Sequence, residues 1–278
     1  MGGLVWLASY PKSGNTWARA FLHNLLGGRA HTQDINAMNA FTITDNAPGW
    51  YKPFIDRPIT EIAPEALAPL RPRVHEAIAR SDPGRILVKT HNALVVHGGA
   101  PMITMALTAG AVYFLRNPLD VAVSYSHHMD CSIDEAIALM ALKGRITPSH
   151  ERGVYQFLGS WSENVESWTR KPNPSLHVMR YEDMLDRPVE SFGALAGFLQ
   201  IAAAPDALAR ATELSSFDRL KAQEQVAGYR EKPNTARSFF RIGRKDQWRE
   251  RLSSRQIAAI LEIHGEQMAR FGYLPEGY

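Results

Sequence analysis

The stretch from residue 4 to residue 26, LVWLASYPKSGNTWARAFLHNLL, most constrains what this chain can fold into. Its apolar start predicts a buried strand, and apolar side chains from Trp17 to Leu25 recur at helical spacing. A glycine-containing loop joins these two elements. Such a loop points backbone N–H groups and the positive end of a helix dipole at one place, where Lys12 adds a full charge. The stretch therefore predicts a phosphate-binding site.

The same stretch also has a purely structural interpretation. In that interpretation Gly14 serves the turn, and Asn15 or Thr16 caps the helix. A Gly/Ser/Lys turn by itself does not decide between the two interpretations. The order of residues does exclude a Walker A sequence, because Lys12 and Ser13 precede Gly14, whereas a P-loop nucleotidase has its Lys-Ser/Thr after the second glycine.

The length of 278 residues fits one domain, and we expect residues 1–278 to form it, because no linker-like segment divides the chain. Hydrophobic and charged fractions of 45% and 21% are ordinary for a globular protein. The single cysteine, Cys131, excludes an intramolecular disulfide and fits a reducing compartment. No apolar run approaches the roughly 20 residues of a membrane span, so we expect a soluble, cytoplasmic protein.

Positive charge is concentrated in one segment. The whole chain carries a formal net charge of +3, whereas residues 219–255 contain eleven Lys/Arg and four Asp/Glu, a local balance of +7. This segment is either a solvated basic face or a binding surface for a small, multiply charged anion. A nucleic-acid surface would more typically combine a pI above about 9 with interleaved aromatic residues or a recognisable fold motif, so a small anion is the better partner.

Four short apolar runs separated by helical segments predict βαβ units, an α/β fold and a central parallel sheet flanked by helices. The predicted strands are residues 4–8, 85–89, 111–115 and 176–179. In open sheets of this kind, ligands bind beyond the carboxyl ends of the strands. Each run is followed there by polar side chains, namely Lys12, Lys89 with His91, Arg116 and Tyr181.

The remaining segments give weaker signals. We expect residues 29–60 to be mostly loop, with aromatic residues that serve either as core or as the wall of an acceptor pocket: Phe41, Trp50, Tyr51 and Phe54. Residues 61–80 and the segment opening at Gly159-Ser160-Trp161 are predicted to be helical. A last helix begins at Ser253, which forms a capping box with Gln256, and stops at Gly272; its His264 is interpreted as a packed or surface histidine.

Several motifs resemble those of sulfotransferases that use 3′-phosphoadenosine 5′-phosphosulfate (PAPS). The segment from Tyr10 to Trp17 looks like the 5′-phosphosulfate loop of that family, and RNPLDVAVS from Arg116 to Ser124 looks like its 3′-phosphate motif. Further similar segments follow in family order: Lys89-Thr90-His91, Gly159-Ser160-Trp161, Tyr181-Glu182-Asp183-Met184, Ser215-Ser216-Phe217 and Phe240-Arg241-Ile242-Gly243. Together they run from near residue 6 to about residue 252.

The resemblance implies transfer of a sulfuryl group from PAPS to a hydroxyl or amine, leaving adenosine 3′,5′-bisphosphate. It implies that Lys12 binds the 5′-phosphate and stabilises the leaving oxygen, that Lys89 assists at the sulfuryl group, and that His91 is the general base. No metal is expected. The other implied ligands of PAPS are Ser13, Gly14, Asn15 and Thr16 at the 5′-phosphate, Arg116, Ser124, Arg241 and Gly243 at the 3′-phosphate, and Trp17, Tyr181 and Phe217 at the adenine.

Two departures from the family pattern are visible. Ile242 stands where many members have a basic residue, so one phosphate contact is missing or moved to Arg244, Lys245 or Arg237. The dimerisation motif of many cytosolic members is not evident, so the sequence predicts no oligomeric state.

His127 and His128 follow the 3′-phosphate motif, and we expect both to be exposed rather than catalytic.

Two other functions remain open at this point: a P-loop-like nucleotide kinase, and a non-catalytic nucleotide-binding protein of the same fold. The acceptor is expected to be a small molecule or natural product, and neither nucleic acid nor a membrane span is expected. The segments that match the family least, residues 36–56, 129–155 and 226–240, are the ones predicted to line the acceptor pocket.

Overall fold

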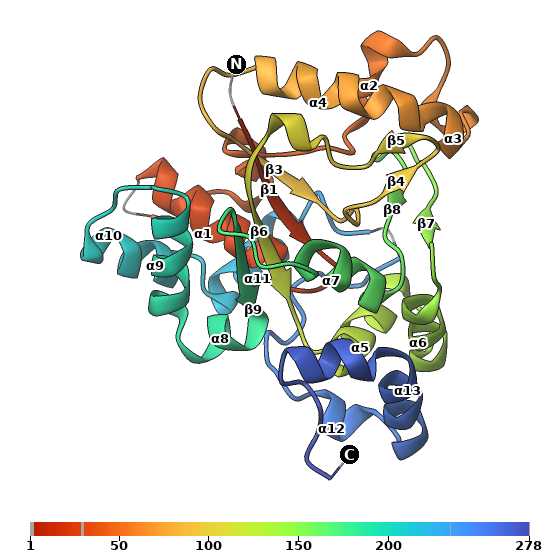
Figure 1. The fold of residues 1–278 in the computed structure, drawn as a ribbon. Helices are drawn as coiled ribbons and strands as arrows, with labels where there is room; N and C mark the ends of the chain where they lie inside the picture. Colours follow the sequence, from red (N-terminus) through yellow and green to blue (C-terminus); the bar gives the residue numbers. More distant parts are fainter. Residues whose placement is uncertain (1–2, 29–30, 234, 278) are drawn as a thin grey trace. The chain divides into compact units, whose positions relative to one another are not determined.

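The computed structural model describes residues 3–28, 31–233 and 235–277, and Figure 1 follows them from β1 to the C-terminal helix α13. The strands are β1 (Leu4–Ser9), β2 (Thr42–Thr44), β3 (Ile86–Thr90), β4 (Val96–His97), β5 (Ala100–Pro101), β6 (Thr108–Leu115), β7 (Ile146–Thr147), β8 (Gln156–Phe157) and β9 (Leu176–Arg180).

The α-helices are α1 (Asn15–Gly27), α2 (Pro48–Tyr51), α3 (Pro64–Leu67), α4 (Arg71–Arg80), α5 (Pro118–Met129), α6 (Ile133–Ala141), α7 (Trp161–Thr169), α8 (Tyr181–Asp186), α9 (Pro188–Phe198), α10 (Pro205–Leu214), α11 (Phe217–Ala227), α12 (Trp248–Arg251) and α13 (Ser254–Arg270). Short 3₁₀ turns are η1 (Ile35–Ala40), η2 (Lys52–Phe54), η3 (Ile59–Glu61), η4 (Ala68–Leu70) and η5 (Met105–Leu107).

The principal sheet has five strands in the order β2-β3-β1-β6-β9. β1 and β3 pair in parallel, with Leu4 opposite Ile86 and Ala8 opposite Thr90. All six residues of β1 are buried, as expected for a strand covered on both faces. The predicted α/β class and central parallel sheet are therefore confirmed.

The predicted strands correspond to β1, β3, β6 and β9, but the sequence did not predict β2. This strand consists of Thr42, Ile43 and Thr44 only, so it carries no apolar run that would signal a strand. Residues 29–60, expected to be mostly loop, contain short helical turns as well, within the part that the structure describes. Of their four aromatic residues, only Tyr51 is fully buried.

The chain comprises two compact units. The first comprises Met1–Tyr10, Ile43–Tyr113 and Leu139–Leu176. It contains β1 and β3 side by side, the helix α4, the small sheets β4-β5 and β7-β8, and the helix α7 (Figure 1). In α7, Ser160 and Glu163 form a capping box, and the predicted core positions Trp161, Val165 and Trp168 are buried.

The second unit comprises Pro11–Thr42, Phe114–Ala138 and His177–Tyr278. In it α1 packs on α10 and η1, α9 packs on α8 and α10, and α5 packs on α12 and α13. The predicted capping box of Ser253 and Gln256 starts α13, and its His264 is packed rather than at the surface, since it is only 1% exposed. Burial lowers the pKa of His264 to about 4.

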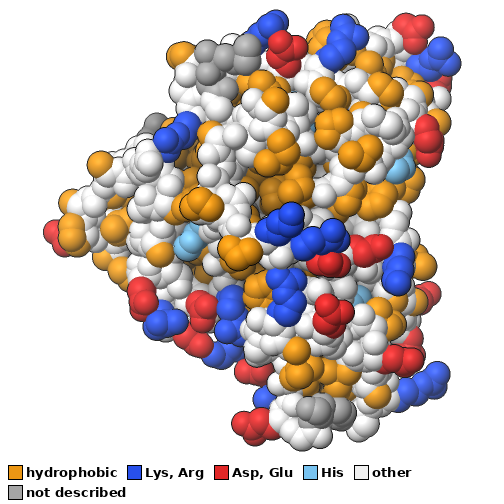
Figure 2. Space-filling model, viewed as in Figure 1, with side chains coloured by type: hydrophobic (Ala, Val, Ile, Leu, Met, Phe, Trp, Pro, Cys, Tyr) orange, Lys and Arg blue, Asp and Glu red, His pale blue; other side chains and the backbone are white. Residues whose placement is uncertain are grey.

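Basic and acidic side chains are interspersed on the face shown in Figure 2. The most exposed large hydrophobic side chains are Val226 in the second unit and Val96 in the first. Within the described ranges, every helix is too short or too polar to span a lipid bilayer.

Candidate active site

The loop after β1 has a left-handed backbone at two positions. Lys12 has a φ of 69° and Gly14 a φ of 98°. Gly14 occupies the N-cap position of α1, so the sequence interpretation in which Asn15 or Thr16 caps this helix is wrong; Asn15 is the first helical residue. Only glycine fits at position 14, because a Cβ there would also lie 2.8 Å from Cδ2 of Tyr181.

The left-handed backbone at Lys12 matters because a side chain makes that conformation costly, typically by 1–3 kcal/mol. Such strain is common at binding sites. Turns in which successive residues adopt right- and left-handed backbone conformations also point their N–H groups into one concave anion-binding site, called a nest. Among the described residues, Ser13 Oγ and Trp17 Nε1 are buried without a hydrogen-bond partner. These two donors have the chemistry that an anionic ligand requires.

The ammonium group of Lys12 lies 4.2 Å above the ring centroid of Phe239, and its Nζ is 3.5 Å from Nδ1 of His128. The expectation that both histidines are exposed is therefore wrong for His128, which is half-buried, and holds for His127. His128 is covered because Thr235 Oγ1 donates to its carbonyl and its ring meets the ring of Phe239 edge to face. Sequence reasoning missed this contact because 116 residues separate His128 from Lys12.

Arg116 connects two distant segments within the second unit. Its two terminal nitrogens donate to the carbonyls of Lys12 and Arg244, each over 3.2 Å. Its guanidinium lies 4.1 Å from the ring centroid of Tyr181, a cation–π contact. Its Nε is buried and makes no hydrogen bond to any described residue. Nε is therefore the one guanidinium nitrogen of this predicted 3′-phosphate ligand that has no hydrogen bond to a described residue.

The three predicted adenine neighbours all lie in the second unit. Trp17 and Tyr181 meet edge to face, with centroids 6.0 Å apart. Trp17 and Phe217 both pack against one core cluster that contains Phe240, and a Cβ at Gly243 would stand 2.2 Å from Cδ2 of the Phe217 ring. The structure thus brings Trp17 together with Tyr181 and Phe217 together with Gly243, and it packs Trp17 and Phe217 against the same core cluster.

The basic segment places Arg241 among like charges. Burial, followed by the charges of Arg251, Arg116 and Arg244, lowers the pKa of Arg241. A site that crowds arginines in this way favours a multiply charged anion. Ser124 lies partly exposed in α5.

Ile242, which stands where many family members have a basic residue, has an exposed side chain and therefore does not face a buried site. Its suggested replacements have other partners or lie at the surface: Arg244 pairs with Glu250, Lys245 pairs with Asp186, and Arg237 is exposed. The structure therefore does not identify a basic side chain that takes the place of the missing one.

In the first unit, His91 directly follows β3 and is oriented by the end of β1. Its Nδ1 lies 2.8 Å from the carbonyl oxygen of Ser9 and 3.1 Å from Ser9 Oγ. A carbonyl only accepts, so Nδ1 carries the proton and the lone pair of the neutral ring is on Nε2. The His91 carbonyl in turn accepts from Nδ2 of Asn164. This tautomer suits a base that acts through Nε2.

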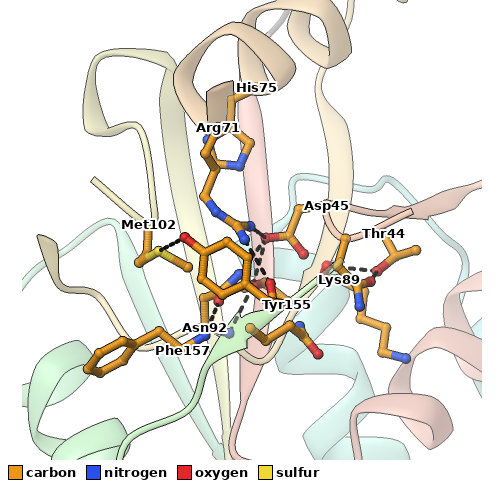
Figure 3. Close-up of polar contacts among 12 residues, drawn as sticks. Thr44, Asp45, Arg71, His75, Lys89, Asn92, Met102, Tyr155 and Phe157 are labelled. Carbon is orange, nitrogen blue, oxygen red and sulfur yellow. Dashed lines mark hydrogen bonds and ion pairs between the residues drawn. The ribbon is translucent and has the colours of Figure 1, made fainter. Parts of the chain in front are cut away.

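Lys89, also in the first unit, is half-buried at the end of β3. Its carbonyl accepts from the backbone N–H of Asp45 over 3.3 Å. Figure 3 shows its side chain pointing away from the buried ion pair formed by Asp45 and Arg71. Sequence reasoning missed that pair, which contacts the residues on both sides of His91.

No group of three or more His, Cys, Asp or Glu side chains arranged to hold a metal ion occurs in residues 3–28, 31–233 or 235–277.

A model of the sulfotransferase domain matches residues 3–272 of this chain. The chain is 26% identical to flavonol 3-sulfotransferase of Flaveria bidentis, an alignment that covers 96% of this chain and 82% of that protein. It is also 26% identical to sulfotransferase 1B1 of Canis lupus familiaris, over 95% of this chain and 82% of that protein. The chain belongs to the sulfotransferase family.

Solved structures show the same fold. Retinol dehydratase in complex with androsterone and the inactive cofactor PAP has a TM-score of 0.64 and 19% identity, over 95% of this chain and 80% of that one. Mouse sulfotransferase SULT7A1 complexed with PAP has a TM-score of 0.59 and 21% identity, over 96% of this chain and 84% of that one.

Proposed function

We propose that this protein is a PAPS-dependent sulfotransferase that sulfates a hydroxyl group of a small or medium-sized acceptor. Membership of the sulfotransferase family supports the reaction class. The PAP bound in the solved relatives supports PAPS as the sulfuryl donor and adenosine 3′,5′-bisphosphate as the product. The observation that carries the proposal is the contact of His91 Nδ1 with the Ser9 carbonyl, because it leaves Nε2 as the basic atom.

The residues of the second unit fit the donor. Ser13 Oγ, Trp17 Nε1 and Arg116 Nε are buried donors without hydrogen-bond partners among the described residues, and phosphate oxygens would satisfy such groups. We assign Lys12 and the N–H groups of residues 13–16 to the 5′-phosphate. We assign Arg116, Ser124, Arg241 and the Gly243 backbone to the 3′-phosphate, and Trp17, Tyr181 and Phe217 to the adenine.

PAPS supplies a sulfuryl group whose bond to the 5′-phosphate oxygen breaks during transfer. In the proposed mechanism, His91 Nε2 removes the proton of the acceptor hydroxyl as its oxygen forms a bond to sulfur. Lys12 stabilises the negative charge that develops on the departing phosphate oxygen, and Lys89 stabilises the sulfuryl oxygens. His91 then holds the proton, which it later loses to solvent. General-base catalysis of this kind contributes about 10²- to 10⁴-fold to the rate.

The acceptor is proposed to be a hydroxyl compound because the relative from Flaveria bidentis is named for sulfation of a flavonol. A panel of phenols, sterols, sugars and amines, offered with ³⁵S-labelled PAPS, tests this assignment. The proposal expects transfer to at least one hydroxyl compound. Transfer to amines alone would contradict the acceptor class.

The catalytic assignment is tested with His91→Ala, using substitution of the exposed His31 by Ala as the matched control. We expect His91→Ala to bind PAP with nearly unchanged affinity in calorimetry and to lose turnover at least a hundredfold. Normal turnover of this variant would contradict the role of His91. Transfer that stops in EDTA, or wild-type protein that fails to bind PAP, would contradict the proposed function and favour a nucleotide kinase or another activity.

A further inference from the structure

An ion pair between Asp45 and Arg71 is completely buried in the first unit. Both side chains are 0% exposed, and Arg71 Nη1 lies 3.4 Å from Asp45 Oδ2. Arg71 is the first residue of α4, and Asp45 directly follows β2. Figure 3 shows the guanidinium and the carboxylate pointing toward each other from these two elements.

The carboxylate of Asp45 binds the residues on both sides of His91. Its Oδ2 accepts from Thr90 Oγ1 over 3.0 Å and from Asn92 Nδ2 over 2.8 Å. The Asp45 N–H also donates to the carbonyl of Lys89. One buried aspartate therefore hydrogen-bonds to Lys89, Thr90 and Asn92, which flank the proposed base on both sides.

These contacts belong to a closed circuit of hydrogen bonds and one ion pair. The side-chain oxygen of Asn92 accepts from the N–H of Phe157 over 2.8 Å. Two residues earlier, the carbonyl of Tyr155 accepts from Arg71 Nη2 over 2.9 Å. The ring of Tyr155 also lies 4.9 Å from the Arg71 guanidinium. The interactions therefore form a closed circuit, drawn in Figure 3: Arg71 binds Asp45, Asp45 binds Asn92, Asn92 binds Phe157, and Tyr155, two residues before Phe157, binds Arg71.

Stability alone does not account for this arrangement. Desolvating two charges costs several kcal/mol per ion, and an apolar pair of similar volume is often as stable or more stable. What an apolar pair cannot provide is the set of directed hydrogen bonds to Thr90 and Asn92. Those bonds hold the side chains on each side of His91, and the Asp45 N–H binds the Lys89 backbone. The His91 ring must remain in line with the Ser9 carbonyl to keep its tautomer.

We infer that Asp45 and Arg71 are positioning residues for His91, holding its ring and tautomer through Thr90 and Asn92. This inference rests on the proposed role of His91 as the base. Neither residue touches the reacting atoms in this proposal. Misplacement of a catalytic group by about 1 Å can cost about 10²-fold in rate, so loss of the pair is expected to lower kcat.

The test uses Asp45→Asn, which keeps the size of the side chain and removes its charge, and Thr90→Val, which keeps the Asp45 charge. Thr90→Val deletes the hydrogen bond to Asp45 and the two that Thr90 Oγ1 accepts from the N–H and Nδ2 of Asn92. The matched control is Val74→Ala, a cavity variant of a buried residue on α4, the helix that carries Arg71. We expect Asp45→Asn to lower kcat about 10- to 100-fold and Thr90→Val to lower it less, with KM for PAPS changed less than about threefold. The control should lose thermal stability without this loss of kcat.

The second readout is the tautomer of His91, measured from its ring ¹⁵N chemical shifts in the protein without substrates. Wild-type protein and Val74→Ala should show the proton on Nδ1, whereas Asp45→Asn and Thr90→Val should show a mixture of tautomers. An unchanged tautomer in a folded Asp45→Asn or Thr90→Val variant would overturn the inference, and so would an equal loss of kcat in Val74→Ala. Because this readout needs no turnover, it remains decisive if PAP binding or sulfuryl transfer fails and the proposed function is wrong.

Discussion

Gly243 lies against the ring of Phe217 so closely that a Cβ at this position would stand 2.2 Å from Cδ2 of the ring. Gly243 also has a φ of 66°, which disfavours any side chain. The contact joins the start of α11 to the basic segment, and both residues are proposed ligands of PAPS. The position of one proposed ligand therefore depends on the absence of a side chain at the other.

We expect Gly243→Ala to weaken PAP binding at least tenfold, because either the Phe217 ring or the 243 backbone has to move. Isothermal titration calorimetry measures this change. Gly272→Ala is the matched control, since Gly272 has a φ of 68° and a Cβ there would meet nothing within 4 Å. It should lose about 1 kcal/mol of stability and bind PAP normally. Equal affinities of the two variants would show that the Phe217 contact has no role in binding.

Because Lys12 has a left-handed backbone, two substitutions can separate the effect of its backbone strain from the effect of its charge. Lys12→Gly removes the ammonium group and relieves the conformation, whereas Lys12→Ala removes the ammonium group and keeps the strain. Both variants should lose kcat about 10²- to 10³-fold, the usual effect of removing one group that stabilises transition-state charge. In thermal unfolding, Lys12→Gly should be at least as stable as Lys12→Ala. A lower melting temperature for Lys12→Gly would argue against strain at this position.

Arg116 holds the carbonyls of Lys12 and Arg244 with two nitrogens of one planar group. Lysine keeps the charge but has a single ammonium nitrogen in place of the planar group with several fixed donors. Arg116→Lys should therefore weaken PAP binding roughly 10- to 100-fold. The exposed Arg80 of the first unit, replaced by Lys, provides the comparison. Wild-type affinity in Arg116→Lys would mean that the charge alone is sufficient.

Acid sensitivity should arise in part from His75. Burial, assisted by the charge of Arg71, lowers the pKa of His75 to about 3, whereas an unfolded histidine titrates near 6.5. Between these values the unfolded chain binds a proton that the folded chain does not, so stability falls as the pH drops from about 6.5 toward 3. One such group contributes up to about 1.4 kcal/mol per pH unit.

His75→Asn should therefore reduce the slope of unfolding free energy against pH, measured by urea denaturation between pH 4.5 and 6.5. Part of the slope should remain, because the pKa of His264 is lowered as well. An identical slope in wild-type protein and variant would refute the contribution of His75.

Much of the fold could be predicted from short apolar runs. The segments around Val88, Phe114 and Met179 signalled strands because each is bounded by turn or helix-start residues, and the helix predicted to open at Gly159-Ser160-Trp161 corresponds to α7. Ile43 gave no such signal, since a strand of three residues has no periodicity to detect.

The site was less accessible to sequence reasoning. The motifs indicated Lys12 and His91, but they could not predict the left-handed backbone of Lys12, which depends on the conformation of the whole loop. Nothing in the sequence pairs Asp45 with Arg71, because a charged residue usually predicts a solvated surface. His128 was interpreted as exposed because the segment that covers it lies more than a hundred residues away along the chain.

The hydrogen bond from Arg116 to the carbonyl of Arg244 spans 128 residues of sequence. A ribosome releases the chain from its N-terminus, so the loop around Lys12 emerges long before the carbonyl that completes the contacts of Arg116. The nascent chain therefore cannot complete the contacts of Arg116 until the segment around Arg244 has been synthesised.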